Sequence, residues 1–417
     1  MSGRRLRGLA LATACLVLAS CATDQATSRT ARPDRHRGVQ QSTGSGTATS
    51  PPPTRATDPP SSMAQSPAPA PAGGAESIDR IVGAMSLRAK VRQLIVVEFT
   101  GTVPPLSVLA RLRPGGLIYF GDNLVDSAQV TRMSHQIERN SRRSGVAALI
   151  MTDQEGGTVT RLPGPVSSLP GGVEFHGNAH WARRVAHRTG AAMRRMGLNV
   201  DLAPVADVDT VGDAGVIGPR SFGSKPGVVS RLVRAQICGY HGSRVGATVK
   251  HFPGHGSTRV DSHDSLPTLH LTRHRWRRVH LPPFVEGIKD GVDLVMVGHL
   301  AFPALDSSGR PASLSRPMVT GWLRHRLGYH GVVITDSLGM GALSSYGGSG
   351  RIAVRAVKAG DDLLLMPVDA GAAVRGLLAA VRDGRIRESR IDGSVHRILA
   401  LKQRLGLLGK PSSLGGC

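Results

Sequence analysis

The sequence has few cysteines and few aromatic residues. Four of its 417 residues are Cys, and Phe, Trp and Tyr together make up 3%. So few cysteines argue against a fold held together by a network of disulfide bonds. The scarcity of aromatic side chains leaves few surfaces on which bases could stack, and no nucleic-acid recognition motif is present. We therefore expect no nucleic-acid partner.

Acidic residues are scarce as well. Asp and Glu number 29 against 52 Lys and Arg, which gives a formal net charge of +23. The first 75 residues hold eight Arg and three Asp, a charge of +5, so +18 remains for the rest of the chain. Such a basic domain fits an anionic phospholipid or an anionic cell-wall polymer as a partner. A general preference for Arg on solvated surfaces explains the charge equally well.

The N-terminal apolar run, residues 9–18, is far shorter than the roughly 20 residues that span a bilayer. Three arginines precede it, and Leu-Ala-Ser-Cys ends it at Cys21. This order predicts a lipoprotein signal peptide over residues 1–20, cleaved before a lipidated Cys21. We therefore expect an exported protein, lipid-anchored to the outer face of the cell membrane. An ordinary signal peptide beside a chance Cys is the alternative, and the export route stays open.

The next segment has little that could form a core. Residues 21–76 consist mainly of Ser, Thr, Pro, Ala and Gly, a composition typical of a disordered tether. Residues 77–417 then provide enough chain for one large catalytic domain.

Eight apolar runs of strand length follow one another in this domain, with segments of helical character between most of them, such as residues 275–290. Parallel strands covered by helices on one side and by core on the other read as such continuous apolar runs. Eight units in this length predict an α/β fold, a (β/α)8 TIM-type barrel. An open doubly wound sheet is the alternative. The expected strands are residues 93–99, 116–120, 147–152, 199–205, 247–251, 294–300, 331–335 and 362–366.

Titratable side chains gather in one loop, residues 250–267, with the sequence KHFPGHGSTRVDSHDSLP. Its glycines and prolines prevent a regular helix across the cluster. Polar residues also stand at or just after the ends of other apolar runs, where a barrel carries its active site. Asp153, Asp207, His299 and Asp336 are the examples. Helix capping is the alternative role for any one of these aspartates.

Two of these features together suggest glycoside chemistry. Asp336 leaves an apolar strand among small residues, so it is a candidate nucleophile. Asp261 and His263 are two residues apart, so in an extended loop both side chains point to one face and can hydrogen-bond. A carboxylate nucleophile and a separate acid/base group are what a double-displacement glycosidase requires.

The chain resembles glycoside hydrolase family 3 of the single-domain β-N-acetylhexosaminidase (β-N-acetylglucosaminidase) type, in its actinobacterial lipoprotein form. The likeness runs over residues 78–407. It is carried by the segments VRQLIVVEF, MTDQEGGTVTRL, NVDLAPVADV, GVIGPRSFGSKP, KHFPGHGSTRVDSHDSLP and GVVITDSLGM, which occur in the family order.

The resemblance implies a retaining exo-enzyme that acts on N-acetylglucosamine-containing glycans of cell-wall or muropeptide origin. It implies Asp336 as nucleophile and His263 as acid/base, with Asp261 assisting His263. It needs no cofactor and no metal. The positions that match the sugar-binding residues of the family are Asp153, Arg161, Arg220, Lys250 and His251.

The chain departs from the family pattern at three positions: Ser257 replaces an acidic or amide residue, Thr158 an Arg, and Arg92 a Gly.

Several alternative functions remain. A neutral imidazole base does not repel phosphate, so the same site could carry out phosphorolysis. His251, His255, Asp261 and His263 could instead bind a metal in a barrel hydrolase. A lipoprotein that binds glycan without cutting it is the third alternative, and for His255 alone we favour a loop-bracing role.

Overall fold

The computed structural model describes residues 72–143 and 145–409. The predicted signal peptide, the lipidated Cys21 and the tether up to residue 71 therefore lie outside the described residues. The first helix begins at Ala72, so it includes the last five residues of the predicted tether.

Eight short parallel strands confirm the predicted barrel. Hydrogen bonds join them as one group of five, in the order β4-β3-β2-β1-β8, and one of three, β5-β6-β7. Parallel bridges from Val200 to Gly246 and from Ile334 to Leu363 connect the two groups and close the ring. The strands are β1 (Ile95–Val97), β2 (Gly116–Tyr119), β3 (Leu149–Thr152), β4 (Val200–Asp201), β5 (Thr248–Phe252), β6 (Leu294–Val297), β7 (Val332–Thr335) and β8 (Leu364–Leu365).

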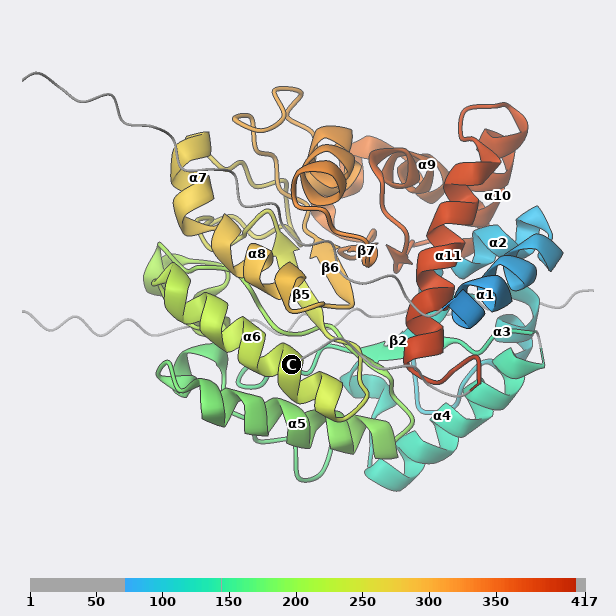
Figure 1. Ribbon diagram of the computed structural model, residues 1–417, viewed down its shortest axis with the longest axis horizontal. Coiled ribbons are helices and arrows are strands. Elements are labelled where there is room, and N and C mark those ends of the chain that lie inside the picture. Colours follow the sequence, from blue (N-terminus) through green and yellow to red (C-terminus); the bar gives the residue numbers. More distant parts are fainter. Residues whose placement is uncertain (1–71, 144, 410–417) are drawn as a thin grey trace, which may run out of the picture. The chain divides into compact units, whose positions relative to one another are not determined.

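Helices lie around these strands, as Figure 1 shows. They are α1 (Ala72–Ala84), α2 (Leu87–Gln93), α3 (Leu106–Leu112), α4 (Ser127–Arg142), α5 (Ala179–Arg195), α6 (Pro226–Gly242), α7 (Arg273–Val279), α8 (Leu281–Lys289), α9 (Ser349–Ala359), α10 (Ala370–Arg382) and α11 (Glu388–Arg404). The shorter or wider helices are η1 (Gly121–Asn123), η2 (Gly172–Phe175), η3 (Gly212–Ala214), η4 (Gly218–Arg220), η5 (Ala312–Leu314), the π-helix η6 (Pro317–Arg326) and η7 (Gly341–Tyr346).

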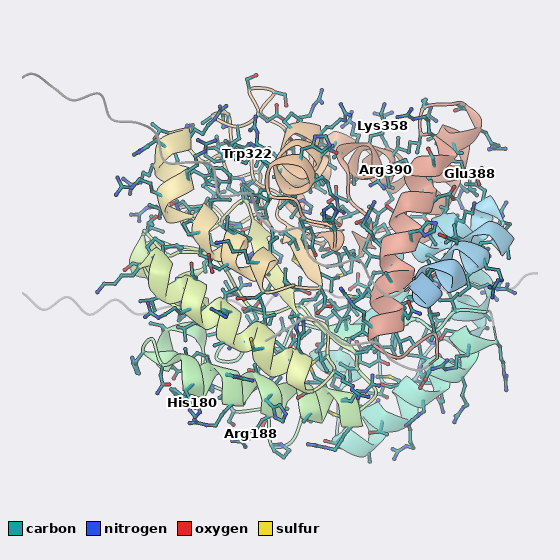
Figure 2. All side chains as sticks on the ribbon, in the orientation of Figure 1. His180, Arg188, Trp322, Lys358, Glu388 and Arg390 are labelled. Carbon is teal, nitrogen blue, oxygen red and sulfur yellow. The ribbon has the colours of Figure 1, made fainter. Side chains whose placement is uncertain are left out.

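The helix expected over residues 275–290 is divided into α7 and α8 at His280. Pro282 and Pro283 follow immediately, and proline lacks the amide hydrogen that would continue a helix. Elsewhere each helix buries one face, because apolar residues recur at helical spacing. Basic side chains cover the outer faces: His180 and Arg188 on α5 and Lys358 on α9 are exposed and are labelled in Figure 2.

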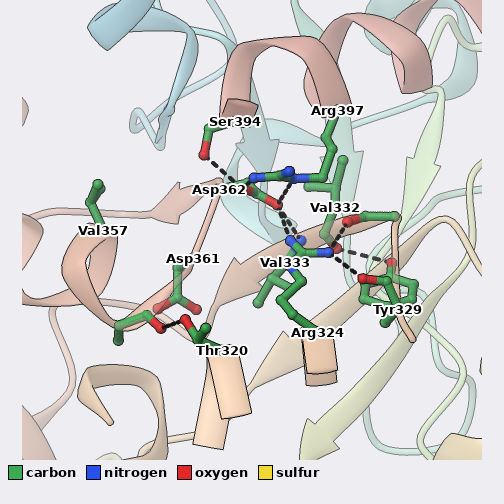
Figure 3. A network of polar contacts seen from close by, with 12 residues as sticks. Thr320, Arg324, Tyr329, Val332, Val333, Val357, Asp361, Asp362, Ser394 and Arg397 are labelled. Carbon is green, nitrogen blue, oxygen red and sulfur yellow. Dashed lines mark hydrogen bonds and ion pairs between the residues drawn. The ribbon is translucent and has the colours of Figure 1, made fainter. Parts of the chain in front are cut away.

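The N-terminal ends of β7 and β8 are fixed by a buried carboxylate, Asp362. Figure 3 shows the guanidinium groups of Arg324 and Arg397 at this carboxylate. Arg397 binds it through two hydrogen bonds of 3.0 and 2.8 Å, and Ser394 Oγ and Val333 N donate two more at 2.6 and 3.0 Å. These contacts tie α11 and η6 to the barrel.

Two further features bear on the sequence predictions. Cys238 in α6 is disulfide-bonded. One such bond is compatible with the expectation that no network of disulfide bonds holds the fold together. A search of the described residues finds no helix whose apolar stretch is long enough to cross a bilayer.

Candidate active site

The predicted site residues surround one cavity at the C-terminal ends of the strands. Its volume is about 420 Å³. Asp153 follows β3, Lys250 and His251 lie in β5, and Asp336 follows β7. All eight predicted catalytic and sugar-binding residues line this cavity: Asp153, Arg161, Arg220, Lys250, His251, Asp261, His263 and Asp336.

A buried ionic network forms the floor of the cavity. Lys250 Nζ lies 2.5 Å from Asp153 Oδ1 and 2.6 Å from Glu155 Oε1. Arg220 binds the same Glu155 carboxylate through Nε and an Nη atom, both at 2.8 Å. Burial opposes ionisation of Glu155, but the charges of Lys250 and Arg220 prevail and hold its pKa far below the usual range. Glu155 is therefore an anchor for the two cations, whereas Asp153 keeps some exposure to the cavity.

His251 is oriented by Asp207. Its Nδ1 lies 2.7 Å from Asp207 Oδ2, and the Asp207 carboxylate also accepts the backbone N–H groups of His251 and, at 2.6 Å, of His255. Burial raises the pKa of Asp207, but the neighbouring His251 outweighs this effect and the net shift is downward. The ionised carboxylate fixes Nδ1–H as a donor, which leaves Nε2 of His251 for the cavity.

Asp336 lies among groups that stabilise its carboxylate. Burial disfavours its charged form, but His251, His299 and the N–H of Ser337 stabilise the carboxylate, so its pKa is lowered. The Ser337 amide donates to Oδ1 at 2.8 Å. His299 Nε2 donates to the Ser337 carbonyl at 2.8 Å and so fixes the turn that carries the carboxylate. Asp336 is thus ionised and held in one orientation.

The Asp261–His263 pair is on a loop and is much more open. His263 Nδ1 lies 2.8 Å from Asp261 Oδ1, while the two side chains are 70% and 42% exposed. The loop contacts the turn after β7: Gly341 N donates to the His263 carbonyl at 2.8 Å and Ala342 N to the Ser262 carbonyl at 3.2 Å. A Cβ at Gly341 would lie 2.4 Å from the Asp264 carbonyl oxygen, so only glycine allows this approach.

Arg161 has spare hydrogen-bonding capacity. Its backbone N–H donates to Gln154 Oε1 at 2.8 Å, which fixes the main chain, and its guanidinium lies 5.9 Å from the centre of the Phe120 ring. The buried Nε atom has no hydrogen-bond partner among the described residues. The Arg161 guanidinium therefore has donor capacity that no described residue uses.

His255 and Ser257 have structural contacts. His255 lies between Ser262 Oγ at 3.0 Å and Thr258 Oγ1 at 2.6 Å, which matches the predicted bracing role. Ser257 Oγ bridges His280 Nε2 at 2.8 Å and Thr210 Oγ1 at 2.6 Å, so this departure from the family pattern is accommodated locally. Over residues 72–143 and 145–409, no three or more His, Cys, Asp or Glu side chains are arranged to hold a metal ion.

Reasoning from the sequence did not assign three residues of this region: Asp207, His299 and Glu98. Asp207 and His299 were noted only as polar residues after apolar runs, and nothing local shows that they hold His251 and the Ser337 turn. Glu98 follows β1 and lines the cavity. Its pKa is raised, mainly because the carboxyl group is partly buried and also because the Asp122 carboxylate is nearby. Its place directly after a strand was the available signal.

Residues 86–401 match the Glycosyl hydrolase family 3 N terminal domain. Beta-hexosaminidase A of Pseudoalteromonas piscicida is 32% identical over 343 residues, which is 73% of this chain and 56% of that protein. The chain thus spans little more than half of that relative.

Two solved structures are also similar. A family 3 beta-N-acetylglucosaminidase from Paenibacillus sp. str. FPU-7 has 42% identity and a TM-score of 0.76, over 79% of this chain and 64% of that one. LpqI of M tuberculosis has 31% identity and a TM-score of 0.70, over 78% of this chain and 96% of that one.

Proposed function

The chain belongs to glycosyl hydrolase family 3, and we propose that it is a retaining exo-β-N-acetylglucosaminidase (β-N-acetylhexosaminidase). One observation carries the proposal: an ionised Asp336 and the Asp261–His263 pair line the same cavity as a cationic sugar-binding floor. The names of the Pseudoalteromonas and Paenibacillus relatives support this substrate class.

In the first step, an Asp336 carboxylate oxygen attacks the anomeric carbon of a β-linked N-acetylglucosaminyl unit. The glycosidic C–O bond breaks, and Nε2–H of His263 gives its proton to the leaving oxygen. Asp261, at Nδ1, stabilises the protonated imidazole and keeps Nε2 directed outward. The product is a glycosyl ester of Asp336, and the sugar configuration is inverted once.

In the second step, neutral His263 takes a proton from water, and the water oxygen attacks the same carbon. The Asp336 ester bond breaks, so a second inversion returns the β configuration. Asp153 accepts hydrogen bonds from sugar hydroxyl groups, Arg161, Arg220 and Lys250 donate to hydroxyl or carbonyl oxygens, and His251 accepts a sugar hydroxyl hydrogen at Nε2. These contacts orient the sugar for attack.

The test uses p-nitrophenyl N-acetyl-β-glucosaminide, with and without phosphate, with product analysis by NMR. We expect free N-acetylglucosamine released first as the β anomer. Sugar 1-phosphate as the main product would instead establish the alternative, a phosphorylase on the same site. His263→Ala should reduce turnover of natural-type glycans more than that of the nitrophenyl substrate, whose leaving group needs little protonation. His330→Ala, another exposed histidine, is the matched control.

We further propose that the enzyme acts outside the cell membrane, held by a lipid on Cys21, on muropeptide or peptidoglycan fragments. Anhydro-muropeptides, soluble peptidoglycan fragments and chito-oligosaccharides assayed side by side would rank the substrates. Preference for chito-oligosaccharides would contradict the cell-wall assignment. Cys21→Ala should move the protein from the detergent phase to the aqueous phase in a detergent-partition experiment.

A further inference from the structure

A second cavity, with an arginine-lined wall, lies away from the catalytic groups. Its volume is about 540 Å³, and it lies among α1, α2, α3 and α4. Gln93, Pro114 and Ala148 line it. Each of them lies one or two residues before the first residue of a strand, β1, β2 and β3 respectively. The cavity is therefore at the N-terminal ends of the strands, the opposite end of the barrel from Asp336.

Three arginines line this cavity, and no acidic residue does. Arg88 and Arg92 are one turn apart on α2, and Arg113 caps α3 with a φ of 50°. Like charges four residues apart destabilise a helix, so the pair has a cost that no neighbouring acid offsets. Burial, and then the charges of Arg88 and Arg113, lower the pKa of Arg92.

Arg92 also has an unused donor. Its Nε atom is buried and makes no hydrogen bond within the described part of the chain. Glu138, the acid on the nearby α4, is paired with Arg142 at 2.9 Å instead. Arg92 is one of the positions where the chain departs from its family pattern. The departure thus adds a guanidinium to a pocket that already has two.

The rest of the lining is largely apolar. Ile81 of α1, Leu109 of α3, Leu117 of β2 and Ile137 of α4 form walls beside the arginines. Guanidinium groups bind phosphate through paired hydrogen bonds, and three of them around one pocket suit a group with several oxygens. Apolar walls add affinity for an apolar body attached to that group. A volume of this size is typical of small-molecule sites.

We propose that this pocket binds a phosphate-bearing amphiphile, with the chemistry of an anionic phospholipid. The position fits such a ligand, because the described chain begins in α1, which lines the pocket. The segment with the predicted lipid anchor is therefore attached to the domain through this helix. The site is independent of the hydrolase activity, since a ligand there is at the other end of the barrel from the reacting sugar.

The test is calorimetric titration of the full chain with three probes: dihexanoyl-phosphatidylglycerol, dihexanoyl-phosphatidylcholine and inorganic phosphate. We expect saturable binding of the phosphatidylglycerol, with both other probes at least tenfold weaker. The variant Arg88→Gln/Arg92→Gln/Arg113→Gln should lose at least tenfold in affinity. Arg183→Gln/Arg231→Gln/Arg278→Gln removes the same charge from exposed positions on α5, α6 and α7 and should change it less than twofold.

Equal losses in the two triple variants would overturn the proposal, because general surface charge would then explain the binding. Absence of saturable binding, or equal affinity for the three probes, would overturn it as well. If the pocket variant does not fold, Arg88→Gln/Arg113→Gln replaces only exposed side chains and should still weaken binding several-fold. Turnover of the nitrophenyl substrate should be unchanged in every variant.

Discussion

Each end of the barrel carries a buried cluster of carboxylates and cations. The two clusters differ in whether a carboxylate remains accessible to a ligand. At the N-terminal end, Asp362 is fully buried and each oxygen is occupied by Arg324, Arg397, Ser394 or a backbone amide (Figure 3). At the C-terminal end, Lys250 and Arg220 are held by Glu155, yet Asp153 remains 18% exposed.

The difference shows that buried charge by itself does not mark a site. The Asp362 cluster is saturated by its own neighbours, so it joins helices and has no capacity for a ligand. The active-site cluster anchors its cations through Glu155 and leaves Asp153 partly exposed to an open cavity. Unused hydrogen-bonding capacity that faces space is the better sign of binding.

Asp336→Asn should produce the largest effect, a fall in kcat on the order of 10³-fold or more, because the amide cannot form the glycosyl ester. The melting temperature should change little. The measurement is nitrophenol release beside thermal unfolding. Asp306→Asn, a change at another aspartate of lowered pKa, is the control and should keep most of the activity. Undiminished turnover in Asp336→Asn would remove Asp336 from the mechanism.

Asp362→Asn should have the opposite effect: the protein should lose stability and keep its activity. Removing one partner from a buried ionic cluster leaves uncompensated charge, which costs about 3–5 kcal/mol of unfolding free energy. The folded enzyme should turn over its substrate at the parental rate at low temperature. Urea unfolding followed by circular dichroism measures the loss. Unchanged stability together with lower activity would contradict the assignment of a structural role to the Asp362 cluster and of catalysis to the opposite end of the barrel.

The sequence was sufficient for the fold, and the eight residues that it named line one cavity, while their roles in catalysis and sugar binding stay predictions. Apolar runs predicted all eight strands, because strands covered on both faces are continuous and apolar. The helix break at His280 was missed although Pro282 and Pro283 indicated it. The contacts that orient the site could not be predicted: Asp207 is 44 residues from His251, and the hydrogen bond between them exists only once the segment after β4 lies beside β5.

The roles of the individual histidines in residues 250–267 could not be predicted from the sequence either. These histidines look alike in the sequence, but the structure divides them among different tasks. His251 lines the cavity beside Asp336, His255 braces the loop through Ser262 and Thr258, and His263 is exposed beside Asp261. Only tertiary contacts distinguish these roles.

Gly341→Ala should give a smaller effect than either carboxylate change. The new Cβ would lie 2.4 Å from the Asp264 carbonyl oxygen and 2.6 Å from that of His263, so the loop with the proposed acid/base, His263, must move. We expect a fall in kcat of roughly 10- to 100-fold, since small misplacements of catalytic groups are expensive. KM should change little, because the cationic floor is untouched. Gly339→Ala meets its nearest neighbour at 3.5 Å and is the control.

The smallest effect concerns a third kind of buried charge, Lys402 of α11. It is fully buried, and Gln93 Oε1, at 2.7 Å, is an amide oxygen that carries no charge. Burial lowers the pKa of Lys402 from 10.5 to about 7. Between these two values the unfolded chain binds a proton that the folded chain does not, so folded stability rises as the pH increases.

Relative to Lys402→Met, the parent protein should therefore gain on the order of 1 kcal/mol between pH 7 and pH 8. Urea unfolding of both proteins at several pH values measures this difference. Lys289→Met, at a lysine that is 65% exposed and paired with Glu286, should show no such trend. If the Lys402 difference were flat with pH, the lysine would be charged in the folded state. The N-terminal end would then contain a buried cation that its neighbours do not neutralise, in contrast to the saturated Asp362 cluster.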